Sequence, residues 1–371
     1  MLESPSLLLT IAAFLLLLGP LVVVHELGHY LVARLFGVRA DAFSVGFGRE
    51  LAGWTDKRGT RWKLSAWPLG GYVQFAGDLN AASMPDDALT ALPPEQREGL
   101  FHFKPLWQRS LIVLAGPLTN LIFAIAIFAA FNLAFGKIVA SPEIARFGEN
   151  SPALAAGMKL GDRIVSIDGT AIVSFTDIPE RVAPFPGRTL TIAVRRGSED
   201  RSFRVRVTDE IERDRFGNEG RIGRLGIGAG KADIVPVAPL EAVTLAGSQT
   251  FGVMRMMITG LGQIITGERS VKELGGPIKI AKFSGEQLSL GWLAFVSFAA
   301  LISINLAFIN LLPIPGLDGG HLAFYAAEAV RRKPLGARSQ EWAFRTGIAL
   351  VLALMLFVTL NDIASLPIFG G

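Results

Sequence analysis

Two histidines and one glutamate at helical spacing could do chemistry in this chain. The run His25-Glu26-Leu27-Gly28-His29 places two imidazoles four residues apart. On an α-helix these lie on one face, one turn apart, and both can reach a single Zn²⁺ at about 2.0–2.1 Å. Glu26 lies about 100° round the helix from His25, so it can stand beside the metal as a base without being a ligand. The same pattern also occurs by chance on solvated helices.

The residues before this motif help to decide between a metal site and a chance match on a solvated helix. The run Leu7–Val24 carries no charged residue and is long enough to approach a membrane span. A charge at membrane depth costs about 2.5–3.5 kcal/mol on insertion scales, so an ionisable cluster there indicates a functional site. Lys and Arg are absent before residue 34, and the apolar run is longer than that of a typical signal peptide. We therefore predict a retained transmembrane helix at 1–36.

The amino-acid composition limits the class of protein to which this chain can belong. The chain has 371 residues, of which 50% are hydrophobic and only 18% are charged, which indicates a polytopic membrane protein. It contains no cysteine, so a metal site must use His, Asp or Glu. The net charge of +4 comes without a basic stripe interleaved with aromatics, which argues against nucleic-acid binding.

Hydropathy predicts a polytopic α-helical membrane protein with four transmembrane helices, a membrane-associated β-hairpin and an inserted α+β domain. Alternation and aromatic residues in Arg61–Phe75 indicate the hairpin, with Pro68–Gly71 near its turn. Short β-type runs at 163–167, 190–194 and 203–207 indicate the inserted domain. The expected parts are spans at 1–36, 106–136, 290–320 and 346–371, a loop with the hairpin at 37–105, the domain at 137–231, an amphipathic segment at 232–289 and a loop at 321–345.

The placement of Lys and Arg near the spans predicts the orientation. These residues cluster between the first and second spans and between the third and fourth. By the positive-inside rule, both of those loops are expected in the cytosol, with both termini and the inserted domain outside.

A catalytic zinc needs a third protein ligand, and Asp318 is the best candidate. It follows the cytosolic end of the third span in a run rich in Pro and Gly, at a depth similar to that of His25 and His29. Irregular backbone at membrane depth is tolerated only in a protein interior or a wet cavity. The alternative is that Asp318 merely begins a helix, and His321 is expected to have a supporting or structural role. The three ligands with Glu26 would perform metal-assisted peptide hydrolysis.

These features resemble the site-2 protease family of intramembrane zinc metalloproteases, and within it the bacterial branch of RseP, the regulator of sigma-E protease. The resemblance covers nearly the whole chain, including Gly116–Asn120 in the second span. It implies a metalloendopeptidase with one Zn²⁺ per chain, held by His25, His29 and Asp318, and with Glu26 as the base. It also implies substrate contacts from the third span and the hairpin, at Asn310, Pro313, Gly70, Gly71, Tyr72 and Val73.

The inserted domain is similar to a bacterial PDZ domain. The run Ser151–Gly169 carries the resemblance, and Gly223–Gly228 resembles the peptide-binding loop and strand, with Leu225, Gly226 and Ile227 as the binding residues. The RseP branch has two tandem PDZ domains, whereas one signature is found here. The family implies a bacterial inner-membrane protein that acts in the bilayer near the cytosolic side. Its substrates would be transmembrane proteins already cut by a first protease, such as anti-sigma factors or signal-peptide remnants.

A different class of function remains open. The chain could be a membrane adaptor that captures protein tails through its PDZ-like domain, with a structural or vestigial zinc site. A metal transporter is less favoured, because the second span and the uncharged part of the fourth, Thr346–Leu360, offer no acidic or histidine residues along a path. Glu26 favours the enzyme, since a structural zinc site has no use for a base beside the metal.

Overall fold

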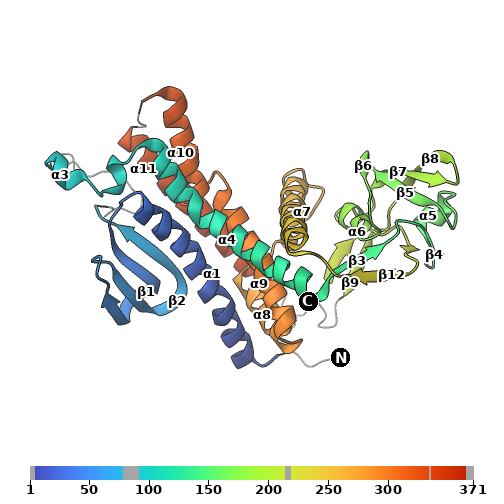
Figure 1. Ribbon diagram of the computed structural model, residues 1–371, viewed down its shortest axis with the longest axis horizontal. Helices are drawn as coiled ribbons and strands as arrows, with labels where there is room; N and C mark the ends of the chain where they lie inside the picture. Colours follow the sequence, from blue (N-terminus) through green and yellow to red (C-terminus); the bar gives the residue numbers. More distant parts are fainter. Residues whose placement is uncertain (1–4, 78–91, 214–218, 334–335, 365–371) are drawn as a thin grey trace. The chain divides into compact units, whose positions relative to one another are not determined.

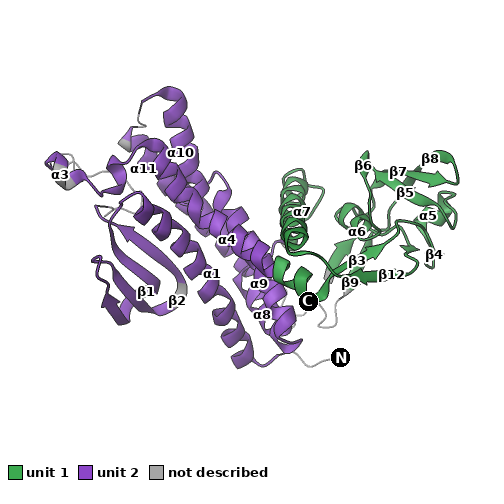
Figure 2. Cartoon of the chain, viewed as in Figure 1, with its two compact units in different colours: residues 1–4, 128–273 green, residues 5–127, 274–371 purple. Residues whose placement is uncertain are grey.

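The computed structural model describes residues 5–77, 92–213, 219–333 and 336–364. The chain divides into two compact units, one formed by residues 5–127 with 274–371 and the other by residues 128–273 (Figure 2). We call them the helical unit and the inserted unit.

Four helices in the described residues are long and apolar enough to cross a membrane. They are α1 (Leu7–Leu35), α4 (Leu106–Phe135), α9 (Trp292–Leu311) and α11 (Ala337–Ala364). Even α9, with 20 residues, reaches about 30 Å, which is the thickness of a bilayer's hydrocarbon core. Many of their large apolar side chains are exposed, as expected where lipid replaces water. The protein is therefore a polytopic α-helical membrane protein.

The helical unit is held together along α1 (Figure 1). Leu17 and Leu21 of α1 are buried in one cluster with Phe295 of α9. The short helix α8 (Pro277–Ser289) packs against the first half of α1. A Cβ added at Gly285 of α8 would lie 2.8 Å from Thr10 Oγ1, so only glycine allows this approach.

The last helix, α11, contacts the N-terminal end of α8. Asp362, near the end of α11, is 2% exposed. Its carboxylate accepts hydrogen bonds from the backbone N–H groups of Gly276 (3.1 Å) and Lys279 (2.9 Å) at the start of α8. These N–H groups have no partner within their own helix, so Asp362 acts as a capping residue supplied by another element.

The expected hairpin is present, but its turn lies elsewhere. Strands β1 (Ala40–Thr55) and β2 (Arg61–Phe75) are antiparallel, and residues 56–60 connect them. Asp56 Oδ1 accepts hydrogen bonds from the backbone N–H groups of Arg58 (2.8 Å) and Thr60 (3.0 Å), which shapes the turn. The turn predicted near Pro68–Gly71 is instead a bend within β2.

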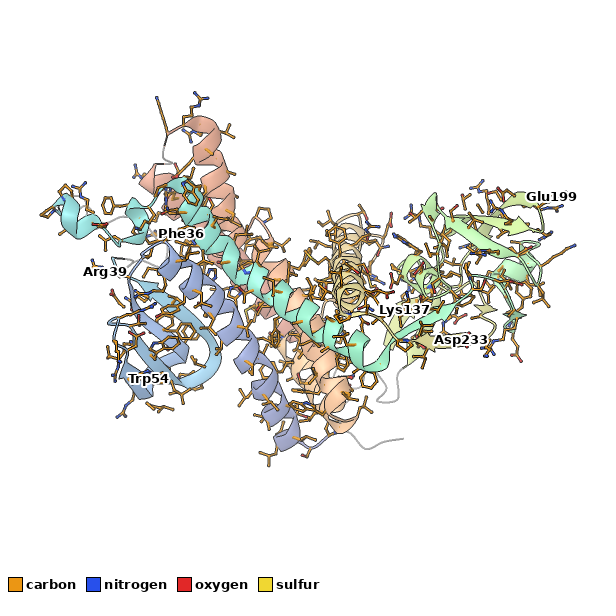
Figure 3. All side chains as sticks on the ribbon, viewed as in Figure 1. Phe36, Arg39, Trp54, Lys137, Glu199 and Asp233 are labelled. Carbon is orange, nitrogen blue, oxygen red and sulfur yellow. The ribbon has the colours of Figure 1, made fainter. Side chains whose placement is uncertain are left out.

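Both strands bend, so the hairpin forms four paired segments. Residues 42–45 pair with 71–74 on one side and with 61–64 on the other, and 61–64 also pair with 52–55. Residues 71–75 therefore lie at one edge of the sheet. Trp54, on the opposite edge segment, is 63% exposed (Figure 3). Such an exposed aromatic suits a membrane interface.

The inserted unit contains a four-stranded antiparallel sheet in the order β6-β5-β7-β8. Strands β5 (Arg163–Ile167), β7 (Thr189–Arg196) and β8 (Glu199–Arg206) coincide with the three predicted strands, and β6 (Thr170–Ala171) completes the sheet. The helices α5 (Pro152–Ala155) and α6 (Asp177–Val182) accompany it. Three two-stranded ribbons surround the sheet: β3–β12 (Lys137–Ala140, Ala232–Val235), β4–β11 (Arg146–Phe147, Ile227–Gly228) and β9–β10 (Glu210–Arg213, Glu219–Ile222).

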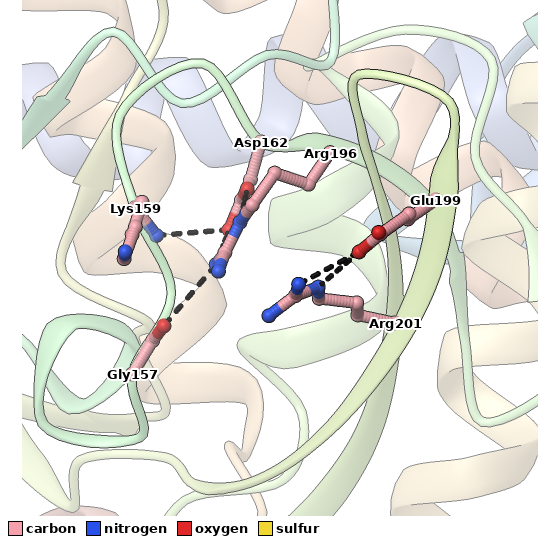
Figure 4. Close-up of polar contacts among 6 residues, drawn as sticks. All are labelled: Gly157, Lys159, Asp162, Arg196, Glu199 and Arg201. Carbon is pink, nitrogen blue, oxygen red and sulfur yellow. Dashed lines mark hydrogen bonds and ion pairs between the residues drawn. The ribbon is translucent and has the colours of Figure 1, made fainter.

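An ion pair fixes the loop between α5 and β5 (Figure 4). Arg196 donates to both carboxylate oxygens of Asp162, at 2.6 and 2.7 Å, and to the carbonyl of Gly157. The backbone N–H of Lys159 donates to the same carboxylate at 2.8 Å. The bidentate guanidinium, helped by this backbone bond, holds the pKa of Asp162 below its ordinary value.

The inserted unit extends beyond the predicted boundary at residue 231. Strand β12 pairs with β3, and the 27-residue helix α7 (Pro239–Ile265) follows it. Lys137, just after α4 (Figure 3), pairs with Glu241, and Asn132 donates to Gln249 at 3.2 Å. These contacts join α7 to this unit, whereas α8 belongs to the helical unit. Leu240, Phe251, Ile258 and Ile265 on α7 are exposed, in agreement with the predicted amphipathic helix.

Candidate active site

Two glycines allow α1 and α4 to approach closely at the histidine motif. A Cβ added at Gly28 would lie 2.4 Å from Thr119 Oγ1 and 2.5 Å from the carbonyl oxygen of Ala115. A Cβ added at Gly116 would lie 2.2 Å from His29 Nε2 and 2.9 Å from His25 Cε1. Small residues commonly let membrane helices pack backbone against backbone. Here they also leave room for both imidazole rings between the helices.

The structure brings His25, His29 and Asp318 together. The two Nε2 atoms are 3.2 Å apart, and Asp318 Oδ2 lies 3.2 Å from that of His25 and 3.5 Å from that of His29. A tetrahedral zinc ion with bonds of about 2.05 Å requires its ligand atoms to be about 3.3 Å apart. The three observed separations fit this value, so these atoms form one face of such a tetrahedron.

The surroundings of these atoms also suit a cation. Asp318 Oδ2 is a buried oxygen that accepts no hydrogen bond from the described part of the chain. His29 Nδ1 lies 2.9 Å from the carbonyl oxygen of Ile112. Since a carbonyl only accepts, this nitrogen carries the hydrogen and the lone pair is on Nε2, which faces the other two ligand atoms.

Asp318 is positioned by α10 (Asp318–Arg331), of which it is the first residue. Thus it also begins a helix, as the alternative interpretation supposed, but its carboxylate turns towards the histidines. Glu328 of α10 pairs with Arg109 of α4 at 3.3 Å, and Arg109 also lies over the ring of Tyr325. These contacts hold α10 against the helix that packs on the histidines.

Glu26 is next to the three ligand residues and outside their set. It lines the same cavity of about 280 Å³ as they do. The edge segment of β2 passes beside it: the main-chain N–H of Val73 faces its carboxylate, and a Cβ added at Gly71 would lie 3.5 Å from its Cγ. The pair of helices and the sheet edge thus bring Glu26, the three candidate ligands and a strand edge together in one place.

Comparisons with known proteins show the family of this chain. The sequence profile of peptidase family M50 matches residues 13–354. The chain belongs to peptidase family M50. A protein of Agrobacterium fabrum named as a zinc metalloprotease is 45% identical over an alignment of 361 positions, which covers 96% of this chain and 96% of that protein. Metalloprotease MmpA of Caulobacter vibrioides is 38% identical over an alignment of 389 positions, which covers 98% of this chain and 97% of that protein.

A solved structure was also found for part of this M50 chain. The PDZ domain of the SdrC-like protein from Listeria monocytogenes is 24% identical, covers 24% of this chain and 84% of that chain, and has a TM-score of 0.19.

The predicted substrate-binding residues of this M50 protein differ in position. Tyr72, Val73 and Asn310 line the cavity with the ligands, and Asn310 Nδ2 donates to the carbonyl of Leu306 at 3.0 Å. Gly71 adjoins Glu26, as described above. Gly70, with φ +110°, is not among the lining residues and lies against the ring of Phe47. Pro313 is not among the residues that line the cavity.

Sequence reasoning did not assign Gly116 and Asn120 to the site. Gly116 was noted only as part of a motif, although its lack of a side chain is what admits the histidine rings. Asn120, completely buried, faces His25 at 3.3 Å. His321, expected to have a supporting role, lines the cavity itself. The four-residue spacing of Gly116 and Asn120 was a usable signal, because it places both on one face of α4.

The predicted peptide-binding residues border a second cavity, in the inserted unit. Leu225, Gly226 and Ile227 line a space of about 460 Å³ together with Ile178 and Val182 of α6. Leu225 is 3% exposed, so its side chain belongs mainly to the core. Gly226 adopts φ +66°, and a Cβ there would lie 2.7 Å from Ser151 Cα.

Proposed function

We propose that this M50 protein is an intramembrane zinc metalloprotease that hydrolyses peptide bonds within transmembrane segments of other membrane proteins. The observation that carries the proposal is the set of three ligand atoms at tetrahedral separations, with Glu26 in the same cavity. His25, Glu26 and His29 lie on α1, a helix long and apolar enough to cross a bilayer, and Asp318 begins the shorter helix α10. A structural zinc site would have no need of a carboxylate beside an open coordination position.

In this proposal His25, His29 and Asp318 hold one Zn²⁺ ion per chain. The donor set of two imidazoles and one carboxylate is typical of catalytic zinc, and its spacing fits as shown above. When bound, Zn²⁺ supplies Lewis-acid chemistry, which polarises the scissile carbonyl and makes water a better nucleophile at neutral pH. Glu26 accepts a proton from the attacking water and delivers it to the leaving amine.

The sheet edge would present the substrate. A peptide bond inside a helix is shielded, so the substrate must unwind before its backbone can be attacked. Within the described residues, no strand pairs with 71–75 on the side away from 42–45. An unwound segment can add to this edge as a further strand, which brings its carbonyls past Glu26. Tyr72, Val73 and Asn310 would contact this segment, and Gly70 and Pro313 would shape the edge and the loop around it.

The remaining assignments follow the family resemblance. We place the protein in the bacterial inner membrane, with both termini and the inserted unit outside and the cavity near the cytosolic side. Substrates would be membrane proteins first cut by another protease. The 460 Å³ cavity in the inserted unit, with its α6 wall and the edge at Ile227, would receive a peptide tail.

The test uses the purified full chain in detergent and a tagged single-span substrate. Wild type is expected to cut it, and Glu26→Gln is expected to lose cleavage while it keeps its zinc content. Glu50→Gln is a matched control, because Glu50 pairs with Arg61 on the hairpin and does not line the cavity. Equal cleavage by Glu26→Gln and wild type would show that the assigned base is wrong. If no variant cuts while a peptide tail binds the inserted unit, the protein is an adaptor.

A further inference from the structure

The second ring nitrogen of His25 faces a single side chain. His25 Nε2 points at His29 and Asp318, whereas His25 Nδ1 lies 3.3 Å from the carboxamide of Asn120. Asn120 is on α4 and is 0% exposed. Asn120 lies on the Nδ1 side of the His25 ring, away from the three ligand atoms. It therefore contacts the site only through His25.

The two histidines must satisfy the same requirement. For Nε2 to offer its lone pair to a metal, Nδ1 must carry the hydrogen and donate it. The carbonyl of Ile112 meets this need for His29. His25 needs an acceptor as well, and the atom of Asn120 that can accept is Oδ1. When Nδ2 is the amide atom that faces His25 Nδ1, Oδ1 of Asn120 is buried and has no partner within the described residues.

A half-turn of the carboxamide satisfies both groups. The amide oxygen and nitrogen have nearly the same shape, so the exchange needs no movement of the backbone. It places Oδ1 at the 3.3 Å position, where it accepts the hydrogen of His25 Nδ1. The opposite arrangement would put the hydrogen of His25 on Nε2, directed at the ligand atoms of the other two residues, and would prevent metal binding.

The backbone around Asn120 is rigid enough for this role. Its carbonyl oxygen accepts a hydrogen bond from Ser303 Oγ of α9 at 2.8 Å, and Ser303 is 0% exposed. One turn earlier Gly116 lies under the imidazole rings, and Thr119 packs against Gly28. Three helices therefore fix the position from which the carboxamide reaches His25.

We propose that Asn120 is a positioning residue for the metal centre: its Oδ1 accepts the Nδ1 hydrogen of His25 and so fixes the tautomer and the orientation of that ligand. This inference rests on the proposed zinc site. Partners of this kind change metal affinity about 10–100-fold when they are removed. Asn120 itself touches neither metal nor substrate.

The experiment compares zinc affinity, measured by competition with a chelator, in the detergent-solubilised full chain. Asn120→Leu removes the acceptor and is expected to weaken zinc binding about 10–100-fold. Asn120→Asp keeps an oxygen acceptor of the same shape and is expected to bind zinc at least as tightly as wild type. Asn132→Leu is the control, since Asn132 is a buried asparagine of the same helix that contacts α7 instead of the site.

The Asp variant separates this role from hydrogen donation. If Asn120 acted by donating its amide hydrogen, Asp would fail as Leu does, and the inference would be overturned. Wild-type affinity in both variants would overturn it as well. If wild type itself binds no zinc, the proposed function fails first. The absorption spectrum of the Co²⁺-loaded protein gives a second readout: it should be unchanged in Asn120→Asp and altered in Asn120→Leu.

Discussion

Gly116→Ala is expected to disrupt the metal centre without unfolding the protein. The added methyl group would lie 2.2 Å from His29 Nε2 and 2.5 Å from its Cε1. Ordinary contact begins near 3.4 Å, so the ring must retreat by about 1.2 Å, and a displacement of about 1 Å in an active site costs about 100-fold in rate. The helix α4 itself would become more stable, because alanine is favoured over glycine within a helix by up to about 1 kcal/mol.

The assay measures three quantities on purified protein: zinc content, substrate cleavage and thermal stability. We expect zinc affinity and cleavage to fall at least about tenfold, while the unfolding temperature of the metal-free protein stays the same or rises. Gly19→Ala is the matched control, since Gly19 lies in α1 with nothing within 4 Å of an added Cβ. It should leave zinc content and cleavage unchanged.

Wild-type zinc content and cleavage in Gly116→Ala would refute this reasoning. Such a result would mean that α1 and α4 separate easily, or that the imidazoles bind metal in another arrangement.

Two further predictions concern parts of the fold away from the metal. Arg196→Ala should destabilise the inserted unit at neutral pH. The Arg196 guanidinium lowers the folded pKa of Asp162, so the pair's contribution is complete above the ordinary value of 3.8 and is lost as the pH falls through the lowered value. The variant should therefore lose less on acidification than wild type, and hydrogen exchange in β7 would measure both effects; equal acid sensitivity would contradict the assignment. Asp362→Ala should cost about 0.5–2 kcal/mol by removing the cap of α8, seen as faster exchange of the Lys279 amide, and slow exchange there would show that another group caps the helix.

The spans and the shared helix face of His25 and His29 could be predicted because their signals are local. An uncharged run of helical length has few alternatives, and His25 and His29 lie one turn apart on any helix. Asp318 was predicted from the expected topology: the first and third spans run in the same direction, so the histidines near the end of one and Asp318 after the end of the other are expected at similar depth. The strands at 163–167, 190–194 and 203–207 could be predicted for the same reason, because alternating residues and turn residues mark them locally.

The contacts between helices could not be predicted from the same signals. Asn120 faces His25 because of how α4 rotates about its axis, and hydropathy says little about rotation when both helices are apolar all round. The hairpin turn was misplaced because Pro68–Gly71 is a strong turn signal, whereas the turn actually used depends on Asp56, whose side chain binds two backbone N–H groups. The association of α7 with the inserted unit could not be predicted, because it depends on contacts with Asn132 and Lys137, far away in sequence.

The order of the ligands along the chain has a consequence for biosynthesis. The histidines and Glu26 are made first, and Asp318 follows only after the second span and the whole inserted unit. At a synthesis rate of about 5–20 residues per second, roughly 15–60 seconds separate His29 from Asp318. During that interval the growing chain has a base and two ligands but no complete metal centre. On the proposed mechanism, the protease is therefore inactive while its first three membrane segments are being made.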